Sequence, residues 1–236
     1  MGVAENMRTI GLIGGMSFES SAVYYRLINE MVRERCGGLS SAELLMHSVN
    51  FEDIVALQKA GDWPSAGVRL GDVALRLQNA GADCVLIGSN TMHLVADDVS
   101  SRVDIPLLHI IDETAKALDA AHRRRPLLLA TRYTMEHGFY TERMKRRGME
   151  MLVPDAADRI VVHDIIFNEL CAGKILDSSR RTLHAIIEKA RDNGADSIIL
   201  GCTEICLILD PDHLPLQGFD TTKIHARAAV DFALGG

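Results

Sequence analysis

Apolar residues in this chain of 236 residues gather in short runs, and within most runs they occupy consecutive positions. Strands with one face in water alternate apolar and polar residues, whereas consecutive apolar residues are typical of strands buried on both faces of a parallel sheet. The pattern therefore predicts eight buried strands. They are expected at residues 10–14, 44–49, 84–89, 106–110, 126–131, 149–154, 197–202 and 215–219.

Stretches with the spacing of an amphipathic helix separate these runs. Alternation of strand and helix favours a parallel sheet whose right-handed crossovers cover its faces. We therefore predict an α/β fold. The helices are expected at residues 18–35, 65–80, 92–101, 112–122, 134–147, 157–172, 179–193 and 221–234.

One pattern occurs twice, as GADCVLIGSNT at residues 81–91 and as GADSIILGCTE at residues 194–204. A second pair consists of IGLIGGMSFES at residues 10–20 and LLLATRYTMEH at residues 127–137. Both members of this pair have an apolar strand, a small turn and a helix start that contains Met. The two pairs predict two pseudo-symmetric domains, each a parallel four-stranded sheet flanked by helices.

The boundary between the two halves is expected near residue 111. The last strand and helix, residues 215–234, are expected to return to the first half. The predicted domains are therefore residues 1–111 together with 215–236, and residues 112–214.

The formal net charge of −7 and the pI near 5.7 argue against nucleic acid or an anionic membrane as a partner, because both require a concentrated positive surface. No apolar stretch approaches the roughly 20 residues of a membrane span, and no signal peptide is expected before the first strand. Five cysteines, an odd number, indicate free thiols in a reduced, cytoplasmic protein.

In parallel α/β sheets, ligands bind beyond the carboxyl ends of the strands, where helix N-termini offer unpaired N–H groups. Small hydroxyl, amide and thiol side chains gather at five of these ends. Helix capping explains each of them singly, but five ends, two of them related by the repeat, favour a ligand site. The candidate residues are Met16, Ser17, Asn50, Ser89, Asn90, Thr91, Thr131, Arg132, Tyr133, Thr134, Cys202, Thr203 and Glu204.

Cys202 is the leading catalytic candidate. It ends a predicted strand and begins a predicted helix, so the helix N-terminus is expected to lower the pKa of its thiol from about 8.5 toward neutrality. The alternative is a buried packing cysteine, which fits Cys84 better because that residue begins its strand. Cys206 lies four residues after Cys202, but two thiols without nearby histidines make a poor zinc site, so no metal is expected.

Several motifs together resemble a known family. They are IGLIGGMSFESSAVYYRLIN, LMHSVNF, SNTMH, PLLHI, ATRYTMEHGFY, GCTEI and FDTTKIHA. From end to end, the chain resembles the aspartate/glutamate racemase family, in particular its broad-specificity amino-acid racemase branch. The resemblance implies a two-domain pseudo-symmetric fold, a homodimer, and a site in the cleft between the domains that needs no cofactor. It also implies two cysteines that exchange a proton with opposite faces of the substrate α-carbon.

The family roles carry over to individual positions. Cys202 matches the cysteine that acts on the L-enantiomer in related racemases. The pairs Asn90-Thr91 and Thr203-Glu204 match positions that hold substrate. Pocket-lining positions of the family are matched by Met16, Asn50 and the stretch from Thr131 to Thr134, which includes Tyr133, and Ser17 is a further candidate for substrate binding.

Two positions depart from the family pattern. Ser89 stands where the two-cysteine racemases have their first cysteine, and a hydroxyl cannot supply an appreciable population of base near neutral pH. It can donate a hydrogen bond or relay a proton from water, and the broad-specificity branch often has threonine at this position. Cys171 stands where the aspartate-racemase version has a lysine that helps hold the substrate carboxylate, which argues against aspartate as the favoured substrate.

The leading hypothesis is a cofactor-independent racemase or epimerase acting on amino acids, with Asp and Glu first. Two alternatives remain open at this point. A single thiol also suffices for a decarboxylase of arylmalonate type or for a maleate isomerase of the same superfamily. An amino-acid-binding protein that has lost turnover is the other alternative, because one architecture hosts several chemistries.

Overall fold

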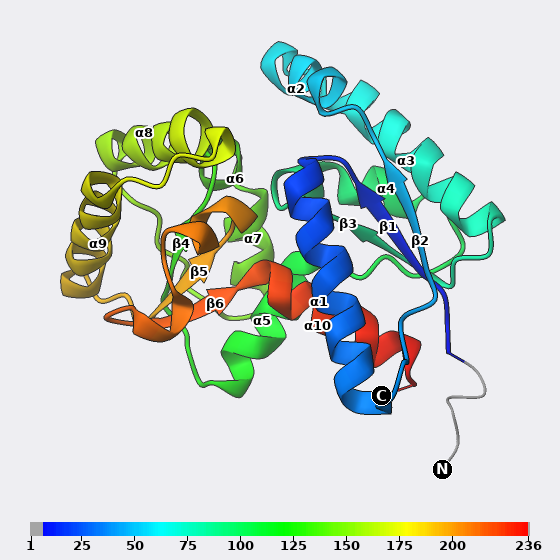
Figure 1. The fold of residues 1–236 in the computed structure, drawn as a ribbon. Helices are drawn as coiled ribbons and strands as arrows, with labels where there is room; N and C mark the ends of the chain where they lie inside the picture. The colour runs from blue at the N-terminus through cyan, green and yellow to red at the C-terminus, as the bar shows by residue number, and fades with distance from the viewer. Residues whose placement is uncertain (1–6, 236) are drawn as a thin grey trace. The chain divides into compact units, whose positions relative to one another are not determined.

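Parallel strands with helices between them make up residues 7–235, the part of the chain that the computed structural model describes (Figure 1). The α/β prediction is confirmed. The chain divides into two units, of which unit 1 comprises residues up to Ile110 together with His225 onward, and unit 2 comprises Ile111–Ile224. Residues 1–6 and 236 lie outside the described residues. The predicted domain ranges include them, and the expectation that no signal peptide precedes the first strand concerns residues 1–6.

Unit 1 is a parallel sheet with the strand order β2-β1-β3 and helices on both faces. On one face, β1 and β3 pack against α1 and the last helix, α10 (Thr221–Ala233). On the other face they pack against α3 and α4. Its elements are β1 (Ile10–Gly14), α1 (Phe18–Cys36), β2 (Leu44–Ser48), α2 (Phe51–Ala60), α3 (Trp63–Asn79), β3 (Cys84–Ile87), the short helix η1 (Thr91–Val95) and α4 (Ala96–Ser100).

Unit 2 has a second parallel sheet, with the order β4-β5-β6. Strands β4 and β5 are buried along their whole length, as their consecutive apolar residues predict. The elements from Ile110 to the C-terminal helix are α5 (Ile110–Ala120), β4 (Pro126–Leu129), α6 (Arg132–Glu136), α7 (Phe139–Arg146), α8 (Ala156–Asp164), η2 (Ile165–Glu169), η3 (Leu170–Ala172), α9 (Asp177–Asp192), β5 (Ser197–Leu200), η4 (Thr203–Leu207), η5 (Pro211–His213), β6 (Gln217–Asp220) and α10 (Thr221–Ala233).

Each sheet has three strands, so the prediction of four was wrong by one strand in each half. The missing strand is reduced to a single parallel bridge, Val85 to Leu107 in unit 1 and Leu127 to Leu152 in unit 2. Proline limits the length of strand pairing in both segments. Pro106 has no N–H to donate, and Pro154 lies two residues beyond the second bridge. The order of segments is nevertheless the same in both halves.

Strand β6 corrects the predicted domain boundary. Residues 215–219 were expected to return to the first half, but β6 pairs with β5 in unit 2 and occupies the place that the Leu107 segment has in unit 1. The helix after each of these segments is grouped with the other unit, since α5 lies in unit 2 from Ile111 and α10 lies in unit 1 from His225. A short strand with few apolar residues does not reveal in sequence which sheet it joins.

The repeated Gly-Ala-Asp passages have the same local structure. The Asp83 carboxylate accepts a hydrogen bond from the backbone N–H of Thr9 at 2.6 Å, and the Asp196 carboxylate accepts one from that of Arg125 at 2.9 Å. Each aspartate thus ties the start of its own strand to the start of the neighbouring strand. The repeat read from the sequence is therefore also a repeat of hydrogen bonds.

The glycines at the other end of the repeat also correspond. The N–H of Gly88 donates to the carbonyl of Ile13 at 2.9 Å, and the N–H of Gly201 donates to that of Leu129 at 2.8 Å. A Cβ on Gly201 would lie 2.9 Å from a methyl carbon of Leu128, too close without a shift. Gly88 and Gly201 therefore follow β3 and β5 at equivalent positions. The next residue is Ser89 in one copy and Cys202 in the other.

Helices among residues 7–235 include none long and apolar enough to cross a membrane.

Candidate active site

The turn after β1 is held by the side chain of Ser21. Its hydroxyl accepts a hydrogen bond from the Gly15 N–H at 2.7 Å and donates to the Ser17 carbonyl at 2.8 Å. The Ser17 hydroxyl accepts from the Ser20 N–H at 3.2 Å and so caps α1. Met16 is only 6% exposed and belongs to the apolar core of unit 1. Of the two predicted site residues in this turn, one therefore caps a helix and the other packs in the core.

Asn50 follows β2 and occupies the N-cap position of α2. Its side chain is exposed and makes no capping hydrogen bond. The carboxamide is therefore not used by the helix, in contrast to the hydroxyl of Ser17.

The segment after β3 contains three predicted site residues in one turn. Asn90 and Thr91 are buried, at 8% and 7% exposure, and Ser89 is half-buried. The Ser89 hydroxyl oxygen accepts a long hydrogen bond of 3.4 Å from the Met92 N–H. A hydrogen bond of this length is weak, so it does little to fix the orientation of the hydroxyl.

His93 fixes the backbone of this turn. The Ile110 N–H donates to its Nε2 at 3.2 Å, so that nitrogen carries no proton, and Nδ1 donates to the Ser89 carbonyl at 2.8 Å. The ring is thus a neutral tautomer that positions Ser89. Both nitrogens of the His93 ring therefore form hydrogen bonds within unit 1.

A buried histidine that the sequence analysis missed lies behind this turn. The Nε2 of His225 lies 2.7 Å from the Leu108 carbonyl, which can only accept, so Nε2 donates. Its Nδ1 therefore accepts from the Tyr24 hydroxyl at 2.9 Å. The rings of His93 and His225 have centroids 5.7 Å apart. The FDTTKIHA motif contained this residue, but an isolated histidine in a helical pattern gave no sign of its burial.

The first turn of α6, after β4, contains the predicted residues of the fourth strand end. Thr131 is the N-cap, and its hydroxyl accepts from the Thr134 N–H at 3.4 Å. The two threonine hydroxyl oxygens lie 3.1 Å apart. Tyr133 is half-buried and stacks on the ring of His137, with centroids 6.0 Å apart. The structure thus brings Thr131, Tyr133 and Thr134 together in one turn.

Cys202 follows β5 in an extended conformation, with φ −152° and ψ 133°, and is the N-cap of η4. Its side chain is half-buried. The thiol donates a hydrogen bond to Oε2 of Glu204, with Sγ and Oε2 2.9 Å apart. This is a short contact for sulfur, and it links two of the predicted site residues directly.

The expected lowering of the Cys202 pKa is wrong. Burial and, after it, the negative charge of Glu204 raise the pKa of this thiol well above its usual value. The helix that follows is a 3-10 helix of five residues, so its dipole is small beside these two effects. The free protein therefore holds Cys202 as a thiol rather than a thiolate at neutral pH.

Three other cysteines, Cys84 in unit 1 and Cys171 and Cys206 in unit 2, differ from Cys202 in their surroundings. Cys84 is fully buried in the core, and burial raises its pKa to about 12, which confirms the packing role predicted for it. Burial, followed by the nearby Asp220, raises the pKa of Cys206. Cys171 is exposed on η3, which packs against η4, and its negative charge when ionised adds to the raised pKa of Cys202.

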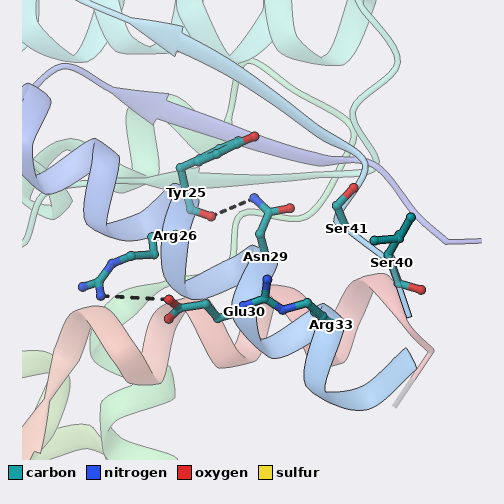
Figure 2. A pocket seen from close by; sticks show the side chains of 8 residues that line it. Tyr25, Arg26, Asn29, Glu30, Arg33, Ser40 and Ser41 are labelled. Atoms are coloured by element: carbon teal, nitrogen blue, oxygen red, sulfur yellow. Dashed lines mark hydrogen bonds and ion pairs between the residues drawn. The ribbon is translucent and has the colours of Figure 1, made fainter. Parts of the chain in front are cut away.

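Two surface hollows lie away from the predicted residues. One, of about 420 Å³, lies between α1 and the chain that enters β2 (Figure 2). Asn29 connects its two walls, because its amide nitrogen donates to the Tyr25 carbonyl at 2.8 Å and its oxygen accepts from the Ala42 N–H at 3.0 Å. The other, of about 290 Å³, is lined in part by Cys206. Neither hollow is lined by any of the predicted site residues. Within residues 7–235, no group of three or more His, Cys, Asp or Glu side chains could hold a metal ion.

Known proteins with this fold include racemases of acidic amino acids. A crystal structure of a candidate Asp/Glu racemase from Yersinia pestis is 45% identical, covers 97% of this chain and 100% of its own, and superposes with a TM-score of 0.92. A structure of an aspartate racemase homologue from Pyrococcus horikoshii is 34% identical, covers 96% and 99%, and has a TM-score of 0.86. A broad-specificity amino-acid racemase from Bacillus subtilis is 24% identical over 163 residues, which are 67% of this chain and 68% of that protein.

These similarities define the class of protein: the chain is an isomerase of the racemase type, built from two α/β units. The model of the Asp/Glu/Hydantoin racemase family matches residues 13–229. The chain belongs to this family, as the resemblance read from its motifs indicated.

Proposed function

We propose that the protein is a cofactor-independent racemase or epimerase of amino acids, with Asp and Glu as the first candidate substrates. Cys202 removes the α-proton of the L-enantiomer, and the opposite face of the α-carbon is protonated from the side of Ser89. The observation that carries this proposal is the Cys202 thiol at the end of a buried strand, hydrogen-bonded to Glu204, in a chain whose repeat has a hydroxyl at the equivalent position.

Ser89 suits the role of a donor rather than a base. Its oxygen accepts the long bond from Met92, and no acceptor for its hydroxyl hydrogen is found among residues 7–235. The hydroxyl can therefore donate to a substrate or to a water molecule that relays a proton. Because an alcohol is a far weaker acid than a thiol, removal of a proton from the D-enantiomer at this side is expected to be slow.

The substrate class follows from the character of the strand ends. Asn50, Asn90, Thr91 and Thr203 are neutral side chains that can both donate and accept hydrogen bonds, so they are compatible with the carboxylate and ammonium groups of an amino acid. Relatives named for aspartate, for Asp/Glu and for broad specificity support amino acids in general. Cys171 stands where the resemblance to aspartate racemases would place a lysine that helps hold the substrate carboxylate, which argues against aspartate as the favoured substrate.

The first test is the exchange of the α-proton for deuterium in D₂O, followed by NMR with L- and D-amino acids. The L-forms should exchange faster than the D-forms under the same conditions, because the thiol can be ionised and the hydroxyl cannot. Equal exchange rates for both enantiomers would exclude the division of roles. Tight binding seen by calorimetry without any exchange would favour the amino-acid-binding protein.

Ser89→Cys should raise turnover of the D-enantiomer by roughly 10-fold or more, because a thiol replaces an alcohol as base. Ser89→Ala is the matched control and should lower turnover in both directions. A Ser89→Cys variant that folds normally and handles D-substrate no faster than the wild type would contradict the assignment of Ser89.

We also propose that the protein acts in the cytoplasm as a homodimer. The free cysteines of the described chain support a reducing compartment. Sedimentation equilibrium measures the oligomeric state directly, and a monomer at micromolar concentration would contradict the proposed homodimer.

A further inference from the structure

His93 lies behind the turn that carries Ser89, and its side chain is only 3% exposed. It belongs to η1, four residues after Ser89, and its Nδ1 donates to the Ser89 carbonyl at 2.8 Å. The Ile110 N–H donates to its Nε2 at 3.2 Å. The ring thus joins the Ser89 backbone to the start of α5, at the residue where the chain leaves unit 1.

The His93 side chain takes the place of a backbone donor to the Ser89 carbonyl. The Met92 N–H donates to the Ser89 hydroxyl, and the His93 N–H donates to the Asn90 carbonyl at 3.1 Å. The bond to the hydroxyl is long, at 3.4 Å, so the position of the hydroxyl depends mainly on where the Ser89 backbone is held. His93 therefore acts on the residue that is proposed to protonate the substrate.

A neutral imidazole suits these two partners. One partner is an acceptor and the other is a donor, and a neutral ring carries one N–H and one lone pair on separate nitrogens. The rings of His109 and His225 lie beside the His93 ring, with centroids at 4.6 and 5.7 Å. In a buried site these neighbours restrict rotation of the ring. The Ser89 carbonyl is therefore held from the core of unit 1.

We propose that His93 is a positioning residue that holds Ser89 for protonation of the substrate α-carbon. It thereby sets the share of proton abstractions that end in the opposite enantiomer. This inference rests on the proposed racemase function. In the first step the Cys202 thiolate takes the α-proton of the L-enantiomer, so the Cα–H bond breaks, an Sγ–H bond forms and the electron pair stays on the substrate.

The second step has two outcomes in D₂O. A deuteron returned by Cys202, whose thiol exchanges with the solvent, restores the L-form. A deuteron from the Ser89 hydroxyl, or from a water molecule bound to it, gives the D-form. In that case an O–D bond breaks, a Cα–D bond forms, and the oxygen recovers a deuteron from the solvent. A displaced Ser89 therefore favours return over inversion.

The inversion ratio measures this share. It is the rate at which D-glutamate forms, followed by chiral chromatography, divided by the rate at which L-glutamate loses its α-proton in D₂O, followed by NMR. Both rates are proportional to the amount of folded protein, so their ratio does not depend on it. A purely structural role of His93 would lower both rates and leave the ratio as it is in the wild type.

His93→Gln and His93→Asn separate the two hydrogen bonds. The Gln amide can place its oxygen near the position of Nε2 and accept from Ile110, but it leaves the Ser89 carbonyl without this donor. Its inversion ratio should fall about 10-fold or more, because a misplaced proton donor reacts slowly. The shorter Asn amide can place its nitrogen near the position of Nδ1 and donate to Ser89, so its ratio should stay within about twofold of the wild type.

His225→Gln is the matched control from the same group of rings. Its hydrogen bonds go to the Leu108 carbonyl and the Tyr24 hydroxyl, so the variant perturbs unit 1 without removing a donor from Ser89. Its inversion ratio should match that of the wild type. An unchanged ratio in His93→Gln, or an equal fall in His93→Asn or in the control, would overturn the proposal.

The turn can also be probed without turnover. In a Ser89→Cys background, the new thiol is alkylated with iodoacetamide and the modified peptide is measured by mass spectrometry. Addition of His93→Gln should raise the alkylation rate about fivefold or more, because the turn opens more often, and addition of His93→Asn should not. An unchanged rate with His93→Gln would sink the inference. A wild type that exchanges no amino acid, together with the expected alkylation rates, would refute only the racemase function.

Discussion

Cys202→Ala should abolish the exchange of the α-proton of L-amino acids, with a loss of about 1000-fold or more. The proposed base is removed, and general-base catalysis contributes about 100- to 10,000-fold to such steps. The measurement is NMR of L-glutamate in D₂O at equal protein concentration.

Cys206→Ala is the matched control for this loss. Cys206 lies on the same helix η4 and is half-buried like Cys202, but its neighbour is Asp220. The control variant should keep most of the exchange activity. Exchange that survives in Cys202→Ala, or an equal loss in both variants, would refute the assignment of Cys202.

The repeat was the part of the fold that could be predicted best from sequence. Gly-Ala-Asp, an apolar strand and a closing glycine form a local pattern, and its aspartate and its closing glycine make equivalent hydrogen bonds in both copies. The placement of β6 could not be predicted in this way. Its residues Gln217–Asp220 carry little apolar character, and only its pairing with β5 shows which sheet it joins.

The same distinction applies to the candidate site. Cys202 could be found because its position in the repeat is visible in the sequence. Its raised pKa could not, because burial and the direction of the Glu204 side chain depend on tertiary packing. The prediction of a lowered pKa considered only the effect of a helix N-terminus. The helix that follows Cys202, η4, is a short 3-10 helix. Met16 shows the reverse case, since a residue at a strand end can still point into the core.

Acid should destabilise unit 1 through His225. Burial lowers the pKa of this ring from 6.5 to about 4 in the folded chain, whereas the unfolded chain takes up the proton near 6.5. The stabilising contribution is therefore complete above about pH 6.5 and is lost as the pH falls toward 4. From pH 7.5 to 4.5 this group alone should lower the free energy of unfolding by about 2.5 kcal/mol.

The neighbours of His225 explain why the ring stays neutral. Its Nε2 already donates to the Leu108 carbonyl and its Nδ1 accepts from the Tyr24 hydroxyl, so a second ring proton would displace the tyrosine proton. The His93 ring lies on another side and brings no negative charge that would favour a cation. Removing the titratable ring while keeping an amide should therefore remove the pH dependence.

Urea unfolding followed by the fluorescence of Trp63 provides the measurement. This is the only tryptophan of the chain and lies in α3, so it reports on unit 1. His225→Gln should be less stable than the wild type at pH 7.5, because its amide cannot satisfy both Leu108 and Tyr24 in the same geometry. Between pH 7.5 and 4.5 it should lose about 2.5 kcal/mol less than the wild type. His47→Gln, on the edge strand β2, is the matched control and should follow the wild type. Equal losses in His225→Gln and the wild type would show that His225 is not the group that acid protonates on unfolding.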